Sequence, residues 1–241
     1  MRVLVIFANR QDAGARSLVD RWSPHAALLT CEDLSVAGWR HTSDQRAGDR
    51  AVIAGRLVAR EEIAGALIRW PAVFGWELHH ILAEDREYVA AEMTAFLRAW
   101  LTRLRCPVLN RPSTASLIGP SWRPEQWVRA AAELGIPVRP LRRHLAFPGE
   151  PAPPLAVEGG FTTVTILGEA CFGQVDPILK DRARSLATAA GVSLLDVYFS
   201  GPEADAEMLS ADLLPSLDAE EKAGAVYELL RSGRRGAGGW A

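Results

Sequence analysis

The stretch VLVIFANRQDAG, residues 3–14, decides the fold class. Its first six residues form a continuous apolar run, which is typical of a parallel strand buried on both faces. Asn9, Arg10 and Asp12 follow at once, so we expect the carboxyl end of this strand to open into a loop. Residues 15–22 indicate a short helix, and residues 26–30 a second apolar strand. Two strands joined by a helix predict an open α/β sheet.

The pattern continues downstream with further strands and helices. Residues 51–58 predict a hairpin around Gly55. Residues 62–70 predict a strand, because the apolar run meets Pro71, which would cut a helix short. Residues 85–104 are the clearest helix, since apolar and aromatic side chains recur at every fourth position. The remaining elements are a strand at 106–110, a helix at 123–134 and the start of a strand at 136–138.

A segment rich in proline and glycine, residues 144–160, is the best candidate for a boundary. We therefore expect an α/β domain with an open, mostly parallel sheet over residues 1–143, followed by a smaller α+β unit over residues 161–232. Residues 233–241 are expected to form a flexible tail. The elements expected in the smaller unit are strands at 162–167 and 194–199 and helices at 177–190 and 218–231.

Composition restricts the class of protein. The formal net charge is −2 and 49% of the residues are hydrophobic, so neither disorder nor a nucleic-acid partner is indicated. No apolar run reaches the length of a secretory or membrane segment. Cys31, Cys106 and Cys171 lie far apart without metal-binding spacing, which favours a reducing cytoplasm. We expect a cytoplasmic protein without membrane or nucleic-acid partners.

Familiar catalytic motifs are missing. The sequence has no G-x-S-x-G, no Walker-type loop and no G-x-G-x-x-G after a strand. Glu77, His79 and His80 include metal-capable groups, but their spacing argues against a shared ion. Ordinary hydrolase, P-loop and dinucleotide-binding classes therefore lose most of their support.

Two groups of polar residues allow two interpretations each. Tyr88 and Glu92 share a helix face with Glu84, where they either anchor a neighbouring loop by hydrogen bonds or carry out acid–base chemistry. Arg111 and Arg123 either meet an anion near the start of a helix or belong to a solvated face. The pattern alone does not decide between these interpretations.

The first unit resembles the preATP-grasp domain of RimK-like and ribosomal-peptide-modifying ATP-grasp ligases. The resemblance rests on the Tyr88–Glu92 helix, on PVLNRP at residues 107–112, on LIGP at 117–120 and on GIPV at 135–138. In that family a Tyr/Glu helix precedes a strand ending in Asn-x-Pro, and a later helix leads to Gly-[Ile/Val]-Pro. The resemblance covers residues up to about Arg143.

The second unit is similar to the closing stretch of the same superfamily. There a Glu-x-Asn pair followed by a proline supplies ligands to the magnesium that bridges the ATP phosphates. Here Ser210 and Asp212 stand at those positions and Pro215 is retained, while Asp196 matches another family carboxylate. The resemblance thus implies Asp196 and Asp212 as metal ligands, with ATP and Mg²⁺ as cofactors.

The chain departs from this family in its centre. A full ligase carries roughly another domain between the two units, with strand lysines that hold the phosphates. This sequence has only Lys180 and Lys222, both expected on helices, and arginine does not replace lysine as a compact phosphate clamp. The resemblance therefore implies a truncated, degenerate relative.

Three functions remain open at this point, and whether the chain is an enzyme is undecided. The first is a binding or accessory subunit of a peptide- or natural-product-modifying system, with a protein or peptide partner. The second is a minimal or partner-completed ATP-dependent carboxylate–amine ligase. The third is an oligomeric interaction protein, for which Trp39, Trp76 and Trp122 are candidate contacts. The residues expected to line a groove between the units are Arg69, Tyr88, Glu92, Asn110, Arg111 and Arg123.

Overall fold

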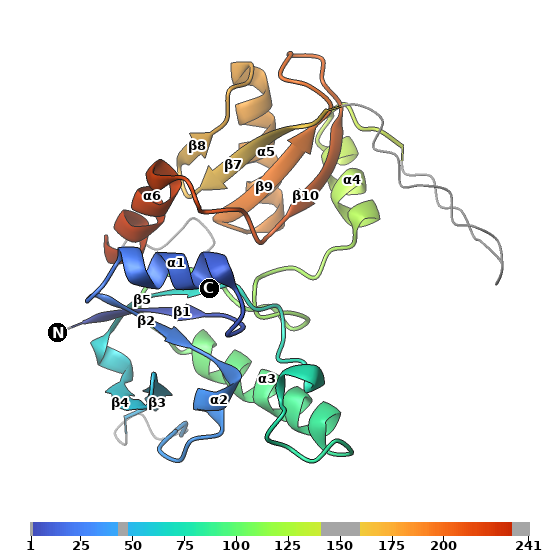
Figure 1. Ribbon diagram of the computed structural model, residues 1–241. Coiled ribbons are helices and arrows are strands. Elements are labelled where there is room, and N and C mark those ends of the chain that lie inside the picture. Colours follow the sequence, from blue (N-terminus) through green and yellow to red (C-terminus); the bar gives the residue numbers. More distant parts are fainter. Residues whose placement is uncertain (1, 43–47, 141–159, 233–241) are drawn as a thin grey trace.

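The computed structural model describes residues 2–42, 48–140 and 160–232. The structure contains two four-stranded sheets, and the second lies above the first in the view of Figure 1. A separate two-stranded hairpin accompanies the first sheet. The first sheet is entirely parallel, with the order β2-β1-β5-β6. Its strands are β1 (Val3–Phe7), β2 (Ala26–Leu29), β5 (Ile63–Ile68) and β6 (Val108–Leu109). The predicted fold class, an open parallel sheet followed by a smaller α+β unit, is confirmed.

Helices cover both faces of the first sheet, as the apolar run at residues 3–8 requires. Val5 and Phe7 face the core that includes α3 (Arg86–Thr102), where Phe7 contacts Trp100 at a ring distance of 6.3 Å. Leu4 and Ile6 point the other way and pack with α1 (Ala13–Arg21). This alternation follows from the period of two in a strand.

A hairpin extends the first unit beyond the sheet. Its strands are β3 (Arg50–Ile53) and β4 (Arg56–Ala59), with α2 (Cys31–Leu34) before them and the short helix η2 (Arg60–Glu62) after them. The predicted hairpin around Gly55 is confirmed. The buried Asp49 fastens it to α3, because its carboxylate is 3.1 Å from Arg60 Nη1 and 3.4 Å from Arg103 Nε.

The second sheet is antiparallel, with the order β10-β9-β7-β8. Its strands are β7 (Thr162–Leu167), β8 (Ala170–Phe172), β9 (Leu194–Phe199) and β10 (Met208–Asp212). One face packs on α5 (Pro177–Ala190), whose Leu179, Ala183 and Leu186 are fully buried. The other face carries a row of polar side chains, Thr165, Asp196 and Asp212.

The helix α4 (Pro124–Glu133), expected at the end of the first unit, packs against β10 and α5 of the second sheet. The segment after it joins the edge of that sheet, because Met208 N–H donates to Pro137 O at 2.7 Å and Arg139 N–H donates to Met208 O at 3.0 Å. The chain therefore crosses between the sheets after β6 and before α4.

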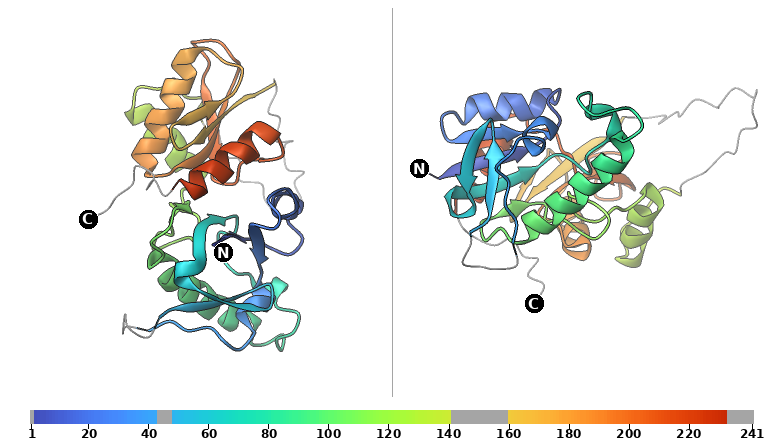
Figure 2. Two further views of the ribbon diagram at one scale, coloured as in Figure 1. Left: turned by 90° about the vertical axis from the view of Figure 1, so that its left-hand side faces the viewer. Right: turned by 90° about the horizontal axis from the view of Figure 1, so that it is seen from below.

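The helix α6 (Glu220–Arg231) lies between the two sheets (Figures 1 and 2). Its Val226 and Leu230 share one core with Leu4 of β1 and with Leu194 of β9. The approach to the first sheet is close: a Cβ atom on Gly65 of β5 would lie 2.7 Å from Leu230 O. Glycine at this position lets the helix rest directly on the strand.

Two expectations fall outside the described residues: the linker at 144–160, apart from Gly160, and the tail at 233–241. The division of the chain into domains thus stays a prediction. Within the described ranges, no helix has both the length and the apolar character needed to cross a bilayer.

Candidate functional site

A row of polar side chains crosses three strands of the second sheet. Thr165 on β7 stands opposite Asp196 on β9, and Asp196 stands opposite Asp212 on β10. Directly opposed residues in antiparallel strands point to the same face. By the same alternation Leu194 belongs to this face, and it packs in the core of α6. The row therefore lies beside α6, on the face that α5 does not cover.

Asp196 is the buried centre of this row, with 4% of its surface exposed. Its carboxylate accepts a hydrogen bond from Thr165 Oγ1. Burial raises the pKa of Asp196, the Thr165 hydroxyl and the Lys222 charge act in the opposite direction, and the Asp212 charge raises it further. Burial and a neighbouring carboxylate thus favour the neutral acid.

Asp212 forms the exposed end of the row. Its Oδ1 accepts the N–H of Leu214 at 3.0 Å, which orients the carboxylate at the end of β10. Tyr198 lies two residues beyond Asp196 on the same face, and its ring meets Phe161 edge-on at 5.5 Å. Burial and the charges of Asp196 and Asp212 raise the pKa of the Tyr198 phenol. The row therefore places two carboxyl groups and a phenol on one face of the sheet, and Asp212 is the exposed carboxyl group.

Thr165, Tyr198 and Lys222 belong to this site although the sequence did not indicate them. The strand period could have found Tyr198, because residues i and i+2 share a face. Lys222 was expected on a helix and so discounted, but the structure places that helix beside the row. No sequence signal shows where α6 packs.

Arg69 and Asn110, two of the expected groove residues, lie at the seam between the units. Arg69 Nε is 2.8 Å from Asp12 Oδ2, and its Nη1 donates to Pro215 O at 3.1 Å. Asn110 is buried; its Nδ2 donates to Leu194 O at 2.8 Å, and its Oδ1 accepts the N–H groups of Ser193 and Leu194 at 3.0 and 2.9 Å. Their contacts join the units, and their role as ligands stays a prediction.

The other four expected groove residues are not hydrogen-bonded to the row among the described residues. Tyr88 and Glu92 are exposed on α3, which lies on the first sheet (Figure 1). Arg111 donates to Leu104 O and Cys106 O within the first unit, at 3.4 and 3.3 Å. Arg123 is exposed at the start of α4. Their binding roles stay predictions as well.

Comparison with known proteins gives a clear result for the fold. No family model matches the chain, and no curated protein matches it. Among solved structures, the macrocyclase MdnC from Microcystis aeruginosa MRC, bound to precursor peptide MdnA, superposes with a TM-score of 0.67 at 12% identity. The match covers 96% of this chain and 100% of MdnC. The ATP-grasp ligase PsnB, with a minimal precursor, gives a TM-score of 0.68 at 12% identity over 97% and 99% of the two chains.

This chain has the ATP-grasp fold. A RimK-domain ATP-grasp protein from Sphaerobacter thermophilus DSM 20745 adds a more distant match, with a TM-score of 0.51 at 16% identity over 94% and 98% of the chains. Another PsnB structure contains Mg and ADP. At these identities the likeness establishes the ATP-grasp architecture.

The described residues of this chain do not by themselves form a complete magnesium site. The row supplies two carboxylates, and the described residues contain no group of three or more metal-capable side chains. Magnesium in nucleotide sites is held by one or two carboxylates together with phosphates and waters. Here burial keeps Asp196 towards its neutral form, and the Lys222 charge already acts on it. Asp196 and Asp212 as metal ligands therefore remain a prediction.

Proposed function

We propose that this chain is an accessory protein of a peptide-modifying system, which binds a peptide partner and has no ligase activity on its own. The observation that carries the proposal is the scarcity of basic groups in the polar row. Asp196 and Asp212 stand side by side, and Lys222 is the cation whose charge acts on Asp196. The row carries more acidic than basic groups.

Phosphoryl transfer depends on cations that neutralise the transferred group, together with metal. Lys180 does not help, because α5 packs on the opposite face of the sheet from the row. The part of the chain between Val138 and Thr162 is also much shorter than the roughly 50 residues of a small domain. These features support loss of the phosphate-binding centre.

The peptide partner is supported by the proteins with the same fold. MdnC was solved with its precursor peptide and PsnB with a minimal precursor. We extend that kind of partner to this chain, and we place it in the cytoplasm, consistent with three free cysteines among the described residues.

The second candidate is a ligase completed by another chain. It is favoured by the exposure of Asp212, since an exposed carboxylate next to Asp196 is accessible to groups brought by a partner. Whether the chain forms a homo-oligomer is a further question. Trp39 packs on Phe96 and Trp100 at 5.4 and 5.5 Å, whereas Trp76 is 59% exposed, so Trp76 is the better contact candidate.

Calorimetry with ATP and ADP, with and without magnesium, tests the absence of ligase activity. We expect no binding at millimolar nucleotide and no release of ADP. Tight magnesium-dependent binding that Asp212→Ala abolishes would overturn the proposal and favour the ligase. The peptide partner is tested by panning a peptide-display library on the immobilised protein, and failure to enrich any sequence would count against it.

A further inference from the structure

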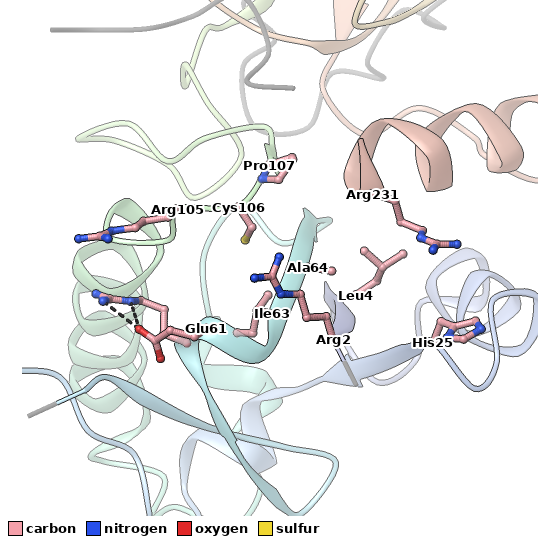
Figure 3. Close-up of a pocket in the computed structure, with 11 residues that line it drawn as sticks. Arg2, Leu4, His25, Glu61, Ile63, Ala64, Arg105, Cys106, Pro107 and Arg231 are labelled. Carbon is pink, nitrogen blue, oxygen red and sulfur yellow. Dashed lines mark hydrogen bonds and ion pairs between the residues drawn. The ribbon is translucent and has the colours of Figure 1, made fainter. Parts of the chain in front are cut away.

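A cavity of about 570 Å³ lies at the amino end of the first sheet (Figure 3), and no residue of the polar row lines it. The amino ends of parallel strands meet at one edge, so Leu4 of β1 and Ile63 of β5 come together there with Pro107, just before β6. These side chains form an apolar floor. The last residue of α6, Arg231, reaches the same cavity because that helix rests on β5.

Four arginines surround the floor: Arg2, Arg60, Arg105 and Arg231. Arg60 is balanced by Asp49 and Glu61, each at 3.1 Å. The others differ, because no ion pair involves Arg2, Arg105 or Arg231 among the described residues. Arg231 instead donates to the Tyr227 hydroxyl at 3.0 Å and lies 5.2 Å from the centre of its ring.

The single carboxylate in the lining, Glu61, is already paired with Arg60. The cavity is therefore strongly positive, although the whole chain has a formal net charge of −2. Cys106 on the cavity wall reports the same field: burial raises its pKa to about 11, while the charges of Arg111 and Arg2 act in the opposite direction. Arg111 thus adds to the positive field here.

Size and chemistry together define the ligand. The volume lies within the roughly 300–1,000 Å³ of sites that hold small ligands, so it admits one or two side chains of a peptide. Guanidinium groups bind carboxylates through paired hydrogen bonds, and the apolar floor suits an aliphatic side chain. We propose that this cavity binds an acidic segment of the partner peptide, with its carboxylates on Arg2, Arg105 and Arg231 and an aliphatic side chain on the floor. The inference rests on the peptide partner of the proposed function.

The test uses the full chain and a fluorescein-labelled peptide of alternating glutamate and leucine, measured by anisotropy. We expect binding that weakens as salt rises and that Arg105→Glu reduces by roughly tenfold, since a reversed charge opposes the acidic peptide. Arg16→Glu is the matched control, because Arg16 is exposed on α1, outside the cavity. It should retain the affinity of the wild type.

The rate of cysteine alkylation independently reports where the peptide binds. Bound peptide should slow the alkylation of Cys106 and leave that of Cys171 unchanged, because Cys171 lies on β8 of the second sheet. Three results would overturn the inference: no binding of the glutamate peptide, equal binding of a glutamine–leucine peptide, or equal losses in Arg105→Glu and Arg16→Glu.

Failure of the cavity and failure of the proposed function give different results. If display-selected peptides bind but neither protect Cys106 from alkylation nor bind more weakly to Arg105→Glu, the proposed binding in the cavity is refuted and the proposed peptide partner is retained. If the chain hydrolyses magnesium-ATP while the glutamate peptide still protects Cys106 from alkylation, the proposed accessory function is refuted and the proposed peptide binding in the cavity is retained.

Discussion

Replacing Asn110 with alanine should weaken the whole fold, because one buried amide makes three hydrogen bonds to the backbone of the second unit. Its partners are Ser193 N–H, Leu194 N–H and Leu194 O, at 3.0, 2.9 and 2.8 Å. With a net value of about 1 kcal/mol for each bond, Asn110→Ala should lower the free energy of unfolding by about 3 kcal/mol. That is a large part of the roughly 5–15 kcal/mol typical of a folded protein.

Urea unfolding followed by tryptophan fluorescence and circular dichroism measures this loss. With a slope of about 2 kcal/mol per molar urea, the midpoint should fall by about 1.5 M. Arg16→Ala is the control, since loss of this exposed side chain on α1 should change stability by no more than about 0.5 kcal/mol. If Asn110→Ala unfolds at the wild-type midpoint, the amide does not join the units, and its expected role as a groove ligand gains support.

Other substitutions test separate contacts. Gly65→Ala should lower the free energy of unfolding by about 1–3 kcal/mol, because the added Cβ meets Leu230. Gly224→Ala lies in open space on α6 and should raise the free energy of unfolding by up to about 1 kcal/mol. If the urea midpoints of both variants shift in the same direction, the close packing at Gly65 is refuted. Because burial raises the pKa of Asp196, the native state holds its proton more tightly than the unfolded chain, and the wild type loses stability as pH rises from the unfolded pKa towards the folded one. Asp196→Asn should lack that loss, so a stability difference that stays constant across the acidic range would contradict the buried position. Asp49→Ala should lower stability by about 3 kcal/mol, because it removes the carboxylate beside Arg103 and leaves Arg60 with Glu61 alone. A thermal melt like that of the wild type would show that the two ion pairs of Asp49 contribute little.

Local signals were enough to predict several elements. The helix expected at residues 177–190 is α5, because Asp176 caps its start by accepting the N–H of Ile178 at 2.9 Å and Gly191 ends it with φ 66°. The strand expected at 194–199 is β9. In both cases neighbouring residues carry the information that sets the ends.

Placement in space was not predictable in the same way. The amphipathic pattern of α4 indicates a helix but carries no information on which sheet it meets, and the structure packs it on β10. The cross-strand position of Asp196 and Asp212 depends on strand register, which only the folded sheet defines. Lys222 reaches the row for a similar reason, since it depends on the docking of α6.

The docking of α6 also has a consequence for the order in which the chain can fold during synthesis. Leu4 and Ile6 are made more than two hundred residues before their partners Val226 and Leu230. Domains generally fold as they emerge, and exposed apolar surface invites aggregation until it is covered. The part of β1 that α6 covers therefore lacks this cover until the residues of α6 have been made, and it is an apolar surface open to association during that interval.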